Sequence, residues 1–149
     1  MDKPNAIHKS VIEQMTMLTV EGAPFDGFRI YPEMPTDEPI QYPCFLITRE
    51  GCETVLEFMG GGCMEVLHVM VQLAFFEKSG QEDSTEKYSM ERLVYKYRRE
   101  LKKFYDELHF DPALNTGEIV QSTEPKVPQN TMDNVWGCSL VLSIIYEED

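Results

Sequence analysis

Apolar residues dominate the segment from Met64 to Phe76. Every odd position from Leu67 to Phe75 is apolar, whereas the even positions include His68 and Gln72. Because successive side chains of a strand point to opposite faces, this segment is predicted to be one long strand with a dry face. The segment from Val135 to Tyr146 also has one alternate set of positions that is entirely apolar, which predicts a second long strand near the centre of a sheet.

A helical period replaces the alternation between Ser84 and Leu108. Apolar residues recur there at steps of three and four, namely Met90, Leu93, Val94, Tyr97, Leu101, Phe104 and Leu108. The pattern predicts one long amphipathic helix whose apolar stripe packs on the sheet. Asp83 and Glu86 have the spacing of a capping box at its start. A first, shorter helix is predicted from Pro4 to about Val20.

Four shorter strands complete the predicted elements. They lie near Phe28 to Tyr31, at Cys44 to Arg49, at Cys52 to Phe58 and near Glu118 to Thr123. A tight hairpin at Glu50-Gly51 is expected to join the second of these to the third, and the glycines at 60–62 are expected to form a flexible hairpin tip. These elements predict a single domain over residues 1–149 of the α+β class. Its mostly antiparallel sheet has about five strands, with the N-terminal helix and the long amphipathic helix packed on one face.

Composition limits the classes of protein that fit this chain. An apolar content of 42% in 149 residues suffices for the core of one domain. No run of about eighteen uncharged apolar residues is present, so no membrane span is expected. The polar start of the chain lacks the apolar segment of an export signal, which predicts a protein made in the cytoplasm.

The net charge of -13 is distributed unevenly. From Ser84 to Leu108 there are seven basic and five acidic residues, whereas the rest of the chain holds six basic and twenty-one acidic residues. The long helix is therefore a basic surface on an acidic body, which disfavours specific nucleic-acid binding and favours a protein partner, including a second copy. The candidate subunit interface comprises Lys96, Arg98, Arg99, Lys102 and Lys103.

No residue pattern predicts a reaction, a metal site or a cofactor. The cysteines, Cys44, Cys52, Cys63 and Cys138, have no Cys-x-x-Cys spacing and are expected to be buried or half-buried free thiols, although a disulfide formed in an oxidising setting stays open. Cys63 and His68 fall on opposite faces of a regular strand, which disfavours a thiol–histidine pair. His8, expected on the polar side of the first helix, and His68 are both interpreted as structural. The chain is therefore not expected to be an enzyme.

Two segments carry a resemblance to a known family. The proline-led strand YPCFLITRE and the closing segment GCSLVLSIIYEED, together with the order of helices and strands, resemble bacteriophage tail terminator, or tail-completion, proteins. That resemblance implies a non-enzymatic virion protein that forms a ring, usually a hexamer, on the last ring of the tail tube. The ring would stop tube polymerisation and join the tail to the head. Its implied partners are the tail tube protein and a head–tail connector protein, with DNA passing through the lumen unbound.

The polar segment before the last strand is the candidate docking loop of such a ring. Its residues are Pro125, Lys126, Val127, Pro128, Gln129 and Asn130. Three alternatives stay open, namely another neck or head-completion component, a small phage or bacterial regulator that binds a host protein through the basic helix, and an enzyme or small-ligand binder with a pocket between helix and sheet. The subunit count, the tail type and the neighbouring proteins are also left open.

Overall fold

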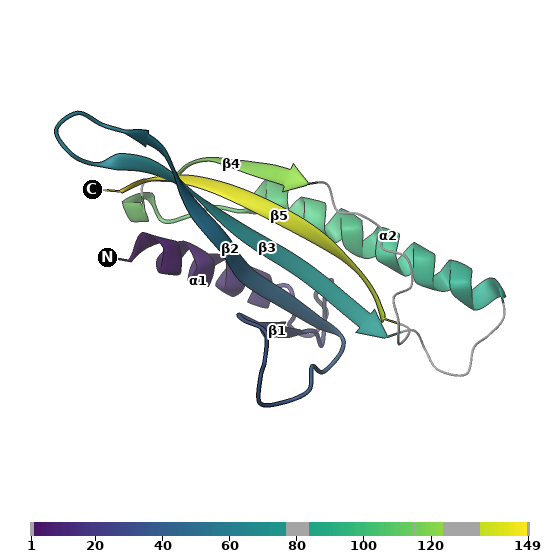
Figure 1. Ribbon diagram of the computed structural model, residues 1–149. Helices are drawn as coiled ribbons and strands as arrows, with labels where there is room; N and C mark the ends of the chain where they lie inside the picture. Colours follow the sequence, from purple (N-terminus) through teal and green to yellow (C-terminus); the bar gives the residue numbers. More distant parts are fainter. Residues whose placement is uncertain (1, 77–83, 115, 124–134, 149) are drawn as a thin grey trace.

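The computed structural model describes residues 2–76, 84–114, 116–123 and 135–148. Its elements are α1 (Lys3–Thr16), β1 (Arg29–Tyr31), β2 (Cys44–Glu57), β3 (Cys63–Phe76), α2 (Ser84–Glu107), the short 3-10 helix η1 (Pro112–Leu114), β4 (Thr116–Thr123) and β5 (Val135–Glu148). The strands β2, β3 and β5 are long and strongly curved, and they form the centre of one sheet (Figure 1).

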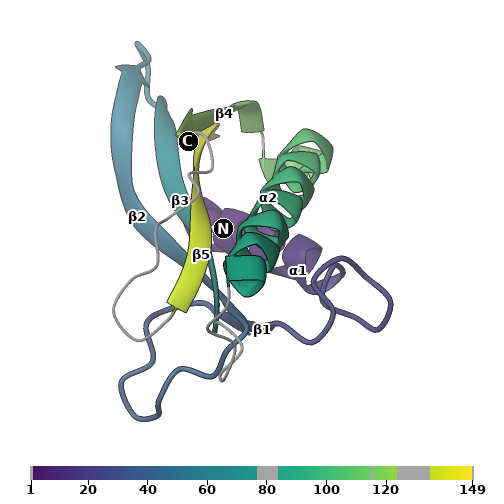
Figure 2. The ribbon, with the colours of Figure 1, turned by 90° about the vertical axis from the view of Figure 1, so that its right-hand side faces the viewer.

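The strands lie in the order β1-β2-β3-β5-β4. The pairs β2–β3, β3–β5 and β5–β4 are antiparallel, whereas β1 runs parallel to β2. Both helices cover the same face of the sheet (Figure 2). The predicted α+β class is thus confirmed. The sheet is mixed, because it contains one parallel pair, β1–β2, beside three antiparallel pairs. No helix within the described residues is long and apolar enough to cross a membrane.

The predicted hairpin at Glu50-Gly51 is wrong, because β2 continues through these residues. The pairing with β3 shifts its register between Arg49 and Gly51. The two turn-forming residues therefore form an irregularity within the strand pair and not a chain reversal. The chain reverses instead at the glycines, where the N–H of Phe58 donates to the carbonyl of Gly62 at 3.0 Å. Glycines 60–62 all have positive φ there, and the predicted glycine hairpin tip is confirmed.

The first helix is shorter than its sequence pattern predicts. It begins after Asp2, whose carboxylate accepts a hydrogen bond from the N–H of Asn5 at 3.1 Å, and it ends at Thr16 instead of near Val20. Its buried face includes His8, so the expectation that His8 lies on the polar side is wrong. The ring Nε2 of His8 lies 2.7 Å from the carbonyl of Ile47 in β2, which ties helix to sheet. The predicted cap at Asp83 lies outside the described residues.

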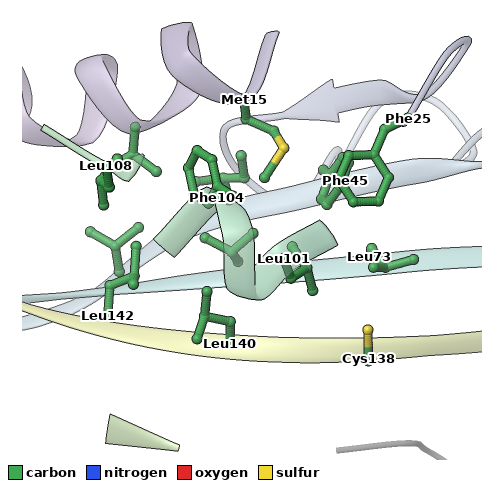
Figure 3. Packing of buried hydrophobic residues seen from close by; sticks show 14 of the residues in the cluster. Met15, Phe25, Phe45, Leu73, Leu101, Phe104, Leu108, Cys138, Leu140 and Leu142 are labelled. Atoms are coloured by element: carbon green, nitrogen blue, oxygen red, sulfur yellow. The ribbon is translucent and has the colours of Figure 1, made fainter. Parts of the chain in front are cut away.

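The hydrophobic core lies between the helices and the odd-numbered side chains of β3. Its fully buried members include Ile7, Val11 and Met15 of α1, Val94 and Leu101 of α2, Val69 and Val71 of β3, and Leu140, Leu142 and Ile144 of β5. Leu101 and Phe104 of α2 belong to this buried cluster (Figure 3). The predicted packing of the α2 stripe on β3 and β5 is confirmed, with Leu93 and Tyr97 half-buried at its margin.

Candidate functional site

The outer side of α2 carries a basic face, defined here as Arg92, Lys96, Arg99, Lys102 and Lys103. All five side chains are exposed, because they lie on the opposite side of the helix from the stripe that packs on the sheet. Tyr95 lies among them and is also exposed, at 53%. A carboxylate oxygen of Glu100 lies 3.8 Å from Nζ of Lys103, so one negative charge partly offsets the positive charge of the cluster. The basic face thus surrounds one exposed aromatic ring with positive charge.

Arg98, a candidate interface residue, does not belong to this outer face. It is half-buried and lies on the side of α2 nearer to β5. Burial raises the pKa of Cys138 in β5 to about 12, and the positive charge of Arg98 acts on that thiol in the opposite direction. The structure adds Arg92 in its place, which the sequence signal of clustered charge between Lys96 and Lys103 missed. Arg92 is four residues before Lys96 and therefore on the same side of the helix, and this spacing would have identified it from the sequence.

The second candidate surface is the end of the β2–β3 hairpin, which projects beyond both helices (Figure 1). Residues 49–61 are all exposed. We define the hairpin end by its acidic residues Glu50, Glu53 and Glu57 and its apolar residues Val55, Leu56, Phe58 and Met59. Met59 is fully exposed at the tip. Large apolar side chains gathered on a projecting segment are typical of a contact with another molecule.

Further carboxylates lie beside the hairpin on β5. In the β3–β5 ladder, Glu147 pairs with Met64 and Glu148 pairs with Cys63. This end of the sheet is therefore acidic, while the outer side of α2 is basic. The candidate docking residues from Pro125 to Asn130 lie outside the described residues, so the surface they were expected to form is not part of this site.

A polar cluster lies at the base of the hairpin. The hydroxyl of Tyr146 donates to Glu65 at 2.5 Å, and the thiols of Cys52 and Cys63 donate to the two carboxylate oxygens of Glu65 at 3.3 and 3.6 Å. Burial and the Glu65 charge raise the pKa of both thiols, which keeps them protonated at neutral pH. Protonated thiols are poor nucleophiles, so this cluster favours a structural role.

The four thiols are free in the structure. Cys44 and Cys138 are buried and Cys63 is half-buried, as predicted, whereas Cys52 is exposed and contradicts the prediction. Cys52 lies on the part of β2 that extends beyond the helices, so no core element covers it. Burial raises the pKa of Cys44 to about 11.

Removing the Tyr146 hydroxyl is expected to weaken the protein at neutral pH more than in acid. The hydrogen bonds from Tyr146 and then Cys52 hold the pKa of Glu65 below its usual value of 4.5. A carboxyl with a lowered folded-state pKa contributes stability above its unfolded pKa and loses it as pH falls through the folded value. Urea unfolding should show a deficit for Tyr146→Phe at pH 7 that shrinks below about pH 4.5. A deficit that stays constant with pH would mean that Glu65 does not need this donor.

His68 joins two other polar residues on the sheet face that the helices do not cover. Its Nδ1 lies 2.9 Å from Oγ of Ser143, and its Nε2 lies 3.3 Å from a carboxylate oxygen of Glu53. A serine–histidine–carboxylate set also needs free N–H donors to stabilise an oxyanion. Ser143 lies in β5 between two paired strands and is nearly buried, so its backbone belongs to the sheet ladders. The geometry therefore favours the structural interpretation of His68.

An apolar cavity of about 540 Å³ lies on that same uncovered face, against the segment between β1 and β2. Its described lining includes Met34, Ile40, Tyr42, Leu46, Gln72 and Ala74, together with Cys44. Among the described residues, the lining contains no carboxylate, histidine or basic side chain, and burial raises the pKa of the Cys44 thiol. The described walls therefore lack histidine, the side chain that most often serves as general acid or base.

Histidine, cysteine, aspartate and glutamate side chains of the described residues form no group suited to a metal ion. The chain was also compared with known proteins. No protein-family model matches the chain, and no curated protein matches it. The basic face and the hairpin end are therefore the structural features that bear on function.

Proposed function

We propose that this chain is a structural virion protein that forms a ring at the end of a phage tail tube. The observation that carries the proposal is the separation of two unlike exposed surfaces on one protomer. The basic face lies on the outer side of α2, and the acidic and apolar hairpin end projects from another part of the molecule. A protomer of this kind suits self-assembly better than catalysis.

The physical reason lies in how unlike surfaces pair. When two different patches on one protomer complement each other, copies join head to tail, and the contact closes into a ring if the rotation per subunit permits. A patch that complemented itself would instead give a two-fold dimer. Unlike charges also steer the encounter of subunits and disfavour wrong pairings.

The excess of acidic residues outside α2 supports the same proposal. DNA affinity comes largely from neutralising phosphates with lysine and arginine. A ring whose basic faces are used between subunits would present mainly carboxylates to its lumen, so that DNA passes without being held. A channel that carries DNA between a phage head and its tail requires this property.

The finer parts of the proposal follow the family resemblance. They are six subunits, attachment to the tail tube protein, arrest of tube growth, docking to a head–tail connector protein and a non-enzymatic role. Another neck component would share the ring and differ in its neighbours. A regulator that binds an acidic host protein through the basic face is the second candidate, since five exposed basic side chains gather there.

Native mass measurement and electron microscopy of the purified chain test the ring. We expect closed rings of several copies, and we expect them to shorten tubes when added to the polymerising tail tube protein of the same virus. Charge reversal at Lys96 and Arg99 should reduce both effects, whereas the matched reversal at Glu33 and Glu38, exposed residues between β1 and β2, should leave them unchanged. A chain that stays monomeric at high concentration and leaves tube length unaltered would contradict the proposal.

A further inference from the structure

We propose that the hairpin end of one copy docks on the basic face of α2 in the next copy, with Phe58 and Met59 packed against Tyr95. This inference rests on the proposed ring and specifies which surfaces meet in it. It joins Met59, the most exposed large apolar side chain of the described residues, to an exposed aromatic ring. It also joins carboxylates to the only cluster of exposed cations among the described residues of α2.

The apolar part of the contact consists of the hairpin tip and Tyr95. Met59 is fully exposed and Phe58 is 39% exposed, so burial of this tip would remove apolar surface from water. Methionine sulfur packs favourably against aromatic rings, and tyrosine is enriched in protein interfaces because it combines a large apolar ring with a polar hydroxyl. Tyr95 offers such a ring on the exposed side of α2, next to Lys96 in the sequence and one turn before Arg99.

The charged part of the contact joins carboxylates of the hairpin to cations of α2. Glu53 pairs with Val66 and Glu57 pairs with Cys63, and the register shift between Thr54 and Leu56 puts the two carboxylates on opposite faces of the hairpin. Whichever face of the hairpin docks, one carboxylate therefore meets the cations of α2. Carboxylates against exposed cations give electrostatic complementarity, which fixes the register of the two copies.

Two different copies are needed for this contact. Within one chain the hairpin extends beyond α1 at one end of the sheet, and residues 49–61 are exposed to solvent and do not pack on α2 (Figure 1). Because the hairpin end and the basic face are different surfaces, each copy gives one and receives one. This is the head-to-tail geometry that builds rings.

A charge-swap series tests the pairing. Reversal on the hairpin (Glu53→Lys with Glu57→Lys) and reversal on the helix (Lys96→Glu with Arg99→Glu) are each expected to weaken self-association at least about tenfold in sedimentation. The chain that carries all four substitutions should regain association, because unlike charges then face each other again. Glu33→Lys with Glu38→Lys serves as the matched control, and circular dichroism checks that every variant is folded.

Photo-crosslinking locates the contact directly. A photoreactive phenylalanine analogue at position 59 is expected to crosslink to residues 92–103 of a second copy, and the crosslink should disappear in the helix-reversal variant. If the native chain forms rings but the analogue crosslinks elsewhere, or if the fourfold variant fails to reassociate while folded, the hairpin contact is wrong and the ring stands. If the chain is monomeric, both proposals are wrong.

Discussion

Replacing Leu101 with alanine is expected to lower the free energy of unfolding by about 2–5 kcal/mol. Leu101 is fully buried on the side of α2 that faces the sheet (Figure 3). Truncation removes apolar contacts and leaves a cavity, because the surrounding sheet and helix relax only partly into the space. Urea unfolding followed by circular dichroism measures the loss.

Lys102→Ala is the matched control for this helix. Lys102 is the next residue, it is exposed on the basic face, and its removal should change the free energy of unfolding by less than about 0.5 kcal/mol. Both substitutions place alanine in the same helix, so helix propensity contributes little to the difference between them. A loss below about 0.5 kcal/mol for Leu101→Ala would place α2 away from the sheet.

The elements that the sequence predicted well are those with long periodic patterns. The odd positions of β3 from Leu67 to Phe75 and the even positions of β5 from Trp136 to Tyr146 are all apolar, and both sets are buried against the helices. The stripe of α2 repeats over many turns and fixes which side faces the sheet. A long pattern repeats the same assignment of buried and exposed sides many times, which explains why the α+β class followed from it.

Short signals failed where tertiary pairing opposed them. Glu50-Gly51 has the composition of a tight turn, yet β2 pairs with β3 on both sides of it and converts the turn into a register shift. His8 is polar, yet one ring nitrogen lies beside the Ile47 carbonyl and permits its burial. Arg98 is adjacent to Arg99 in sequence, yet a rotation of about 100° per residue puts the two on different sides of α2.

The candidate surfaces were predicted only in part. Charge clustering pointed to α2, because opposite signs on one chain are visible without a structure. The hairpin end was missed, because its importance depends on how far β2 and β3 extend beyond the helices. The contacts of Glu65 and His68 also depend on strand register, which places residues more than seventy positions apart side by side.

Gly137 provides a test in which sequence and structure predict opposite signs. Glycine within a strand usually costs about 0.5–1 kcal/mol relative to alanine, so its position inside β5 predicts that Gly137→Ala stabilises the protein. In the structure, a Cβ at this position would lie 2.1 Å from the carbonyl oxygen of Leu73 and 3.3 Å from Cα of Ala74. Both atoms belong to the backbone of β3, which cannot move aside as a flexible side chain would.

The expected result for Gly137→Ala is a loss of about 3 kcal/mol or more in the free energy of unfolding, because β3 and β5 must separate locally and the overpacking is against backbone. Ser139→Ala is the control, since Ser139 shares the face of Gly137 and the change adds no volume, and it should cost about 1 kcal/mol or less. Urea unfolding measures both, and amide exchange along β3 should accelerate near Leu73 in the glycine variant only. Unchanged or increased stability of Gly137→Ala would mean that β3 and β5 are not paired in this register, because the pairing of Ala74 with Gly137 is what brings Leu73 against the added methyl group.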